Sequence, residues 1–146
     1  MTSACPGTRS TPRFLGGVLC HVAIPCVDLE AGEAFYVGAL GATLFRSYPD
    51  RRTYGLANLQ VVTHLSPPQA ILWEPDVYPR HFGLTLAHLA DFDAMVQRCL
   101  DQRVPVILPR QVRFSGQREE HLTCIVRDPS HNLVEFKHYN DPAMAF

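Results

Sequence analysis

The sequence predicts an α+β fold built from two βαβββ modules. Three observations lead to this prediction. The order of one strand, one helix and three further β-type segments occurs twice. A proline-rich stretch over residues 66–80 separates the two occurrences, and each opens on a strand that contains a histidine, His21 or His81. The repeat therefore depends on the order of the elements and on this shared position.

The first module is expected to open with a strand over residues 17–24, which is short, apolar and β-branched, and which Pro25 stops. Asp28 is then predicted to cap a helix that runs to Gly41. Three β-type segments follow, over residues 42–48, 53–57 and 59–65.

The second module repeats this order. Residues 81–87 alternate as a strand, and Asp91 is predicted to cap a helix with apolar residues at helical spacing from Phe92 onward. Further β-type segments are expected near residues 104–108, from 111–114 running on through 121–126, and over 132–139.

The domain organisation follows from these elements. We expect a flexible tail over residues 1–14 and one domain over 15–146, with modules at about 17–65 and 81–140 joined by the linker 66–80.

Composition excludes several classes of protein. The net charge of -1, without a block of like charge, argues against nucleic-acid binding. No apolar run is long enough to cross a membrane. The five cysteines are scattered without Cys-x-x-Cys pairs, which favours a reducing, cytoplasmic location.

The histidine of each leading strand shares its face with small residues. By the two-residue period of a strand, Ala23 lies beside His21 and Gly83 beside His81. Small side chains next to an imidazole leave a concavity, whereas a packing face would carry larger apolar residues. The pattern indicates a ligand or metal cleft.

Glu135 in the last strand completes a set of metal-ligand types. Two neutral imidazoles and a carboxylate from three strands would form a facial 2-His-1-carboxylate set, which suits Fe(II), Mn(II) or another divalent ion. The residues alone leave a second interpretation open, in which each histidine is hydrogen-bonded in the core or at an edge, and Glu135 lies beside Lys137 on a solvated face.

Other polar residues are weaker candidates for the same cleft. Gln60 and His64 share a strand face and could supply a fourth ligand or a hydrogen-bonding group, or face solvent. His121 is a candidate acid or base. Arg113 could hold an anionic substrate, or it could simply be an exposed arginine of a strand. The remaining histidines are expected to be structural or exposed: His88, His131 and His138.

Two segments resemble the vicinal oxygen chelate superfamily. They are the opening Leu-Cys-His-Val-Ala-Ile-Pro-Cys-Val-Asp and the ending Asp-Pro-Ser-His-Asn-Leu-Val-Glu-Phe, in the context of the paired βαβββ order. The superfamily includes glyoxalase I, extradiol dioxygenases, fosfomycin-resistance thiol transferases, methylmalonyl-CoA epimerase and metal-free bleomycin-binding proteins. The resemblance covers about residues 17–140 and implies that the modules pair into a curved mixed sheet enclosing a metal and substrate cleft.

The resemblance also implies a metal site and an activity. It assigns His21, His81 and Glu135 as ligands of one divalent ion: Fe(II), Mn(II), Ni(II) or Zn(II). The implied protein is an enzyme acting on a small oxygen-chelating substrate, either dioxygenase-like (an oxidoreductase) or glyoxalase-like (a lyase). The alternative is a metal-free bleomycin-type binding or resistance protein. Single-domain members often pair, and exposed strand edges are compatible with a homodimer.

The sequence departs from each named enzyme. Glyoxalase I adds a carboxylate from the strand at 59–65, which has no Glu here. The epimerase resembles this set if Gln60 is the fourth ligand. Ala23 stands where fosfomycin enzymes carry Thr. Extradiol dioxygenases share the His-His-Glu set and have further pocket residues, which His64, His121 or Tyr139 would provide, but they usually contain two paired domains.

Overall fold

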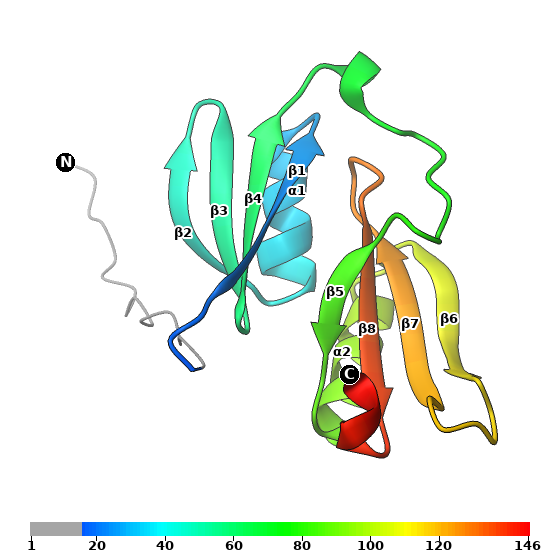
Figure 1. The fold of residues 1–146 in the computed structure, drawn as a ribbon. Coiled ribbons are helices and arrows are strands. Elements are labelled where there is room, and N and C mark those ends of the chain that lie inside the picture. The colour runs from blue at the N-terminus through cyan, green and yellow to red at the C-terminus, as the bar shows by residue number, and fades with distance from the viewer. Residues whose placement is uncertain (1–15) are drawn as a thin grey trace.

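The computed structural model describes residues 16–146, so the tail expected over 1–14 lies outside the described residues. Figure 1 shows two four-stranded sheets, with strand orders β1-β4-β3-β2 and β5-β8-β7-β6. In each sheet the leading strand lies at an edge and pairs in parallel with the last strand of its module, and the other pairs are antiparallel. The predicted α+β fold of two βαβββ modules is confirmed.

The elements have the following bounds. The first module contains β1 (Cys20–Cys26), α1 (Leu29–Glu33), a π-helical segment (Ala34–Ala39), β2 (Thr43–Tyr48), β3 (Arg51–Leu56) and β4 (Leu59–Leu65). The second contains β5 (Phe82–Thr85), α2 (Leu89–Asp101), β6 (Val106–Arg113), β7 (His121–Arg127) and β8 (Leu133–Tyr139). Short 3-10 turns lie at Pro68–Ala70 and Pro142–Ala145.

Local chemistry explains the first helix. The Asp28 carboxylate accepts hydrogen bonds from the backbone N–H groups of Glu30 and Ala31 at 2.9 and 3.0 Å, which confirms the predicted N-cap. The helix then widens into π-helical geometry and ends before Gly41, whose φ of 77° lies in the left-handed region that glycine adopts freely.

Three predicted boundaries are wrong. β1 continues through Pro25, which an edge strand tolerates because the missing N–H breaks no ladder bond. Asp91 does not cap α2, because the helix begins at Leu89 and Asp91 lies in its first turn, where a carboxylate favours the helix dipole. The segments predicted at 104–108 and 111–114 form the single strand β6, whose register shifts around Leu108.

The strand predicted to run from 111 on to 126 is also interrupted. Phe114 and Gly116 have φ angles of 55° and 76°, and this turn separates β6 from β7.

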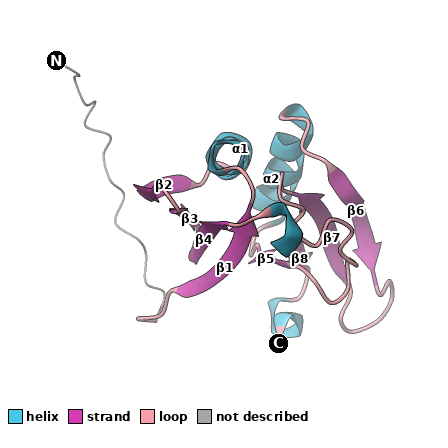
Figure 2. Ribbon diagram, turned by 90° about the horizontal axis from the view of Figure 1, so that it is seen from above, coloured by secondary structure: helices cyan, strands magenta, loops and turns pink. Residues whose placement is uncertain are grey.

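Both helices cover the same side of the two sheets, as Figures 1 and 2 show together. Phe92, Val96 and Cys99 of α2 are buried in a core with Val134 and Phe136 of β8. Alternate residues of every strand point away from this core. We call this side of each sheet its outward face. No helix within residues 16–146 is long and apolar enough to span a membrane.

The turn between β7 and β8 joins the two modules. The buried Asp128 carboxylate accepts hydrogen bonds from the Tyr36 hydroxyl of the first module at 2.8 Å and from the backbone N–H groups of Ser130 and Asn132 at 2.8 and 2.9 Å. Burial raises the pKa of this carboxyl, and its hydrogen bonds oppose the shift. The same turn also contacts the first module through Val27 N–H to Ser130 Oγ and Asn132 Nδ2 to the Pro25 carbonyl.

Asp128→Ala should therefore destabilise the protein strongly. The substitution leaves the Tyr36 hydroxyl and two backbone N–H groups without their acceptor, and we expect the free energy of unfolding to fall by ~2 kcal/mol or more. Chemical denaturation measures this change. Asp101→Ala, which removes an exposed carboxylate, is the control and should change stability by less than ~0.5 kcal/mol. Equal effects of the two substitutions would contradict this role of Asp128.

Candidate functional site

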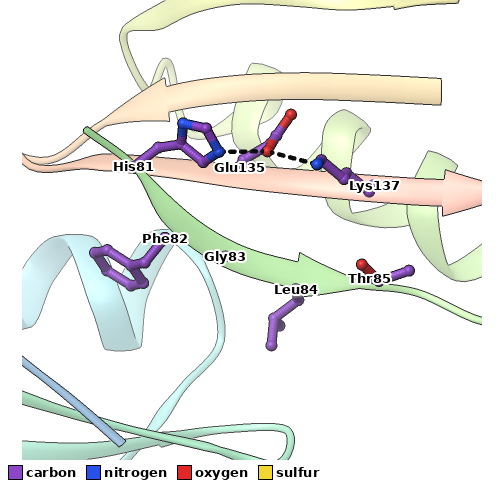
Figure 3. Close-up of a pocket in the computed structure, with 7 residues that line it drawn as sticks. All are labelled: His81, Phe82, Gly83, Leu84, Thr85, Glu135 and Lys137. Atoms are coloured by element: carbon purple, nitrogen blue, oxygen red, sulfur yellow. Dashed lines mark ion pairs between the residues drawn. The ribbon is translucent and has the colours of Figure 1, made fainter. Parts of the chain in front are cut away.

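His81 and Glu135 meet on the outward face of the second sheet (Figure 3). The parallel register of β5 and β8 pairs Gly83 with Glu135, and His81 lies just before β5. His81 Nε2 is 2.9 Å from Glu135 Oε2. Two of the three predicted ligands therefore converge, from elements that are more than fifty residues apart in the sequence.

The Glu135 carboxylate is buried, with 3% of the residue exposed. Oε1 accepts a hydrogen bond of 2.6 Å from the fully buried hydroxyl of Thr123 on β7. Oε2 lies 3.3 Å from Lys137 Nζ as well as next to His81. A buried carboxylate requires such partners, because water no longer solvates its charge. These contacts fix the orientation of both oxygens.

The tautomer of His81 follows from its other ring nitrogen. Nδ1 is 2.7 Å from the Val77 carbonyl oxygen, and a carbonyl can only accept, so Nδ1 carries hydrogen and donates. In the neutral ring, Nε2 then presents a lone pair to the lone pairs of Glu135 Oε2. A hydrogen bond between these two atoms, or a metal ion bound by both, would remove this repulsion. Metal-binding histidines commonly donate their second N–H to a carbonyl in this way.

A glycine allows β5 to approach β8 closely at this point. A Cβ atom added to Gly83 would overlap the backbone carbonyl oxygen of Glu135. Gly83, which was predicted to leave room beside His81, therefore also allows the backbones of β5 and β8 to approach each other. The resulting open cleft has a volume of about 270 Å³ and is lined by His81, Phe82, Gly83, Leu84, Thr85, Glu135 and Lys137.

Three further predicted residues occupy the same outward face, at the other end of the strands. His121 lies opposite Tyr139 on β8 with ring centroids 4.8 Å apart, and Arg113 lies opposite His121 on β6. His121 Nδ1 is 2.8 Å from the Glu119 carbonyl, which leaves Nε2 as the nitrogen able to accept a proton. Tyr139 lies four positions, or about 13 Å, beyond Glu135 along β8.

The first-sheet candidates form a separate group. His21 pairs in register with Gln60, and Pro25 pairs with His64, so all three candidates lie on the outward face of the first sheet. His21 and His64 are exposed and Gln60 is half-buried. Among residues 16–146, no three His, Cys, Asp or Glu side chains converge closely enough to hold an ion. His21 therefore does not join His81 and Glu135 within the chain.

The other histidines have surroundings that fit structural or surface positions. His138 is buried with Nδ1 3.0 Å from the Leu86 carbonyl, and His131 packs edge-on against Trp73. His88 is exposed at the start of α2.

The sequence pattern missed several residues of the site. Lys137 is placed beside Glu135 by the strand period, but only as part of the alternative interpretation of a solvated face and without a role at the site. Thr123 reaches Glu135 only through the register of β7 and β8, and Val77 and Tyr78 belong to the proline-rich linker, which has no periodicity to place them.

Comparisons with known proteins agree with this fold. The family model described as Glyoxalase/Bleomycin resistance protein/Dioxygenase superfamily matches residues 18–136. A structure of a glyoxalase/bleomycin resistance protein/dioxygenase from Alicyclobacillus acidocaldarius is 40% identical, covers 89% of this chain and 97% of its own, and superposes with a TM-score of 0.85. No curated protein matches the chain.

Two more distant structures share the fold. Lactoylglutathione lyase from Agrobacterium tumefaciens is 18% identical over 84% of this chain and 93% of its own, with a TM-score of 0.61. The fosfomycin resistance protein FosX from Listeria monocytogenes is 17% identical over 89% of this chain and 98% of its own, with a TM-score of 0.68.

Gly83→Ala should separate β5 from β8. We expect the free energy of unfolding to fall by about 1–3 kcal/mol, because the added Cβ must displace the backbone of Glu135. Thermal or chemical denaturation tests this expectation. Gly38→Ala is the matched control, since a Cβ there meets no atom within 4 Å and Gly38 lies in a helical segment, so it should be neutral or slightly stabilising. Equal stability of the two variants would show that β5 does not need this close approach.

Proposed function

This chain belongs to the Glyoxalase/Bleomycin resistance protein/Dioxygenase superfamily, and we propose that it is a metal-dependent enzyme in which His81 and Glu135 bind a divalent ion. The observation that carries the proposal is the convergence of His81 Nε2 and Glu135 Oε2, with His81 Nδ1 held by the Val77 carbonyl. The donor set of imidazole and carboxylate suits Fe(II), Mn(II), Ni(II) or Zn(II).

The spacing of the two donor atoms fits one ion. Nε2 and Oε2 are separated by 2.9 Å, so both atoms would be able to bind the same ion. The Thr123 hydroxyl donates a hydrogen bond to the other carboxylate oxygen of Glu135 and so orients this ligand. Lys137 has 29% of its side chain exposed, which leaves its ammonium free to move away from Oε2 when an ion binds.

We further propose that the third ligand, His21, comes from a second copy of the chain. Asp128 and the helices hold the two modules together on their covered side, and this arrangement keeps His21 away from His81 and Glu135. Neither α1 nor α2 covers the outward faces, and β1 and β5 are edge strands without a partner on one side. A homodimer that sets the first-sheet face of one copy against the second-sheet face of the other would complete the set.

The proposed substrate is a small molecule with two neighbouring oxygens. A bound divalent ion supplies a Lewis acid that stabilises negative charge developing on such oxygens. Lys137 adds positive charge at the same place. Arg113, Tyr139 and Gln60 would orient the substrate, and His121 or His64 would accept a proton. This division of roles serves a dioxygenase-like or a glyoxalase-like lyase reaction.

The second candidate function is metal-free binding of a ligand, as in a bleomycin-type resistance protein. One observation favours it. Thr123, Lys137 and a protonated His81 together satisfy the Glu135 carboxylate without an ion. Under this alternative the outward faces would bind a compound without chemical conversion.

Metal titration separates the two functions. Chelator-treated protein should gain thermal stability when Fe(II) under anaerobic conditions, Mn(II), Ni(II) or Zn(II) is added, because only the folded state presents both donors. Glu135→Gln should weaken binding of the preferred ion by about 10–100-fold. Glu74→Gln removes an exposed carboxylate and should leave affinity unchanged. If none of these ions raises the melting temperature, the metal proposal is wrong and the metal-free alternative stands.

Mixing variant subunits tests the shared site. His21→Ala and Glu135→Gln should each bind little metal alone, whereas equal amounts unfolded and refolded together should form heterodimers with one intact site each. The mixture should bind about a quarter of the wild-type metal, as measured by elemental analysis. His88→Ala alone should bind metal like the wild type. A mixture that binds no more metal than its parents would exclude the proposed exchange of His21 between copies.

A further inference from the structure

We propose that Tyr78, Arg113 and Phe114 form a receptor for the carboxylate of an aromatic acid, next to the His81–Glu135 pair. This inference depends on the proposed function, because it names the class of substrate for that site. It makes use of a group of exposed aromatic and basic side chains that the fold itself does not require.

Arg113 lies between two aromatic rings. Its guanidinium carbon is 5.2 Å from the ring centre of Tyr78 and 5.4 Å from that of Phe114. Such stacking on ring faces holds the planar guanidinium in one orientation. A hydrogen bond of 3.2 Å from Nη1 to the Tyr78 hydroxyl adds a second constraint. The arginine is therefore fixed in place before any ligand binds.

The charge of Arg113 has no carboxylate partner in the part of the chain that the structure describes. Arg51, Arg52 and Arg110 each form an ion pair with an Asp or Glu, whereas Arg113 belongs with the arginines of residues 16–146 that form none. The Tyr78 hydroxyl is the one side-chain hydrogen-bond partner that Arg113 has within residues 16–146. The remaining N–H groups of its guanidinium can donate hydrogen bonds to the two oxygens of a carboxylate.

The two rings next to Arg113 are exposed, at 49% for Tyr78 and 43% for Phe114. Phe114 also has a φ of 55°, a left-handed backbone conformation that bulky residues seldom adopt. His121 continues the row, with its ring centroid 5.7 Å from that of Phe114 and 4.8 Å from that of Tyr139. A planar aromatic ligand can stack on such a surface.

Tyr78 connects this receptor to the proposed metal ligands. Its ring centroid is 5.4 Å from that of His81 and 5.2 Å from the guanidinium carbon of Arg113. An aromatic acid with its carboxylate at Arg113 would therefore direct the rest of its ring toward His81 and Glu135. A ring oxygen in that direction is the group that the proposed function requires.

The test measures binding of small acids to the full chain by isothermal titration, both metal-free and with the preferred ion. The probes are 3,4-dihydroxybenzoate, catechol, which lacks the carboxylate, and cyclohexanecarboxylate, which lacks the aromatic ring. We expect 3,4-dihydroxybenzoate to bind about tenfold more tightly than either of the others. Arg113→Gln should remove this preference, and Tyr78→Leu should weaken the binding of 3,4-dihydroxybenzoate. Arg110→Gln is the matched control, because Arg110 lies on the same strand but pairs with Asp93.

Each outcome bears on one proposal. Loss of the preference for 3,4-dihydroxybenzoate in Arg113→Gln but not in Arg110→Gln supports the receptor. Equal binding of the three probes, or an affinity for 3,4-dihydroxybenzoate that Arg113→Gln leaves unchanged, overturns it. If Arg113-dependent binding of 3,4-dihydroxybenzoate occurs while no divalent ion binds, the receptor stands and the metal proposal fails. If a divalent ion binds but the three probes bind equally, the metal proposal stands and the receptor fails.

Discussion

The parallel pairing of β5 with β8 is the contact on which the site depends. It brings His81 from the end of the linker beside Glu135, near the C-terminus of the chain, and it requires a residue without a side chain at Gly83. Thr123, Lys137 and the Val77 carbonyl then fix the two side chains. The outcome is a buried carboxylate facing an imidazole nitrogen, an arrangement that needs a positive charge between or beside them.

The turn at Asp128 determines what this pair can contact. By accepting hydrogen bonds from Tyr36 and from its own turn, Asp128 holds the covered sides of the two modules together. Neither α1 nor α2 covers the outward faces. His21, Gln60 and His64 lie on one of these faces, and His81, Glu135 and Arg113 lie on the other. The division between the two faces is the reason for proposing a site shared between two copies.

Much of this arrangement could be predicted from the sequence. Period-two alternation places His21, His81 and Glu135 on the faces they occupy, because strand periodicity is a local property. The start of α2 and the course of β6 could not be predicted in this way. His88 precedes the helix without a side-chain cap, and β6 shifts register near Leu108. These details depend on packing against distant segments.

Contacts between strands cannot be predicted from local sequence either. The contact of Thr123 with Glu135 depends on the register of β7 and β8, and Tyr78 and Val77 reach the site from a linker without periodicity.

A crystal of the protein grown with Mn(II) or Zn(II) tests the central claim most directly, through the anomalous signal of the ion. The account predicts one peak per chain bonded to His81 Nε2, a Glu135 oxygen and His21 of a second copy. Crystals that bind the ion elsewhere, with Lys137 and His81 still paired to Glu135, would contradict it.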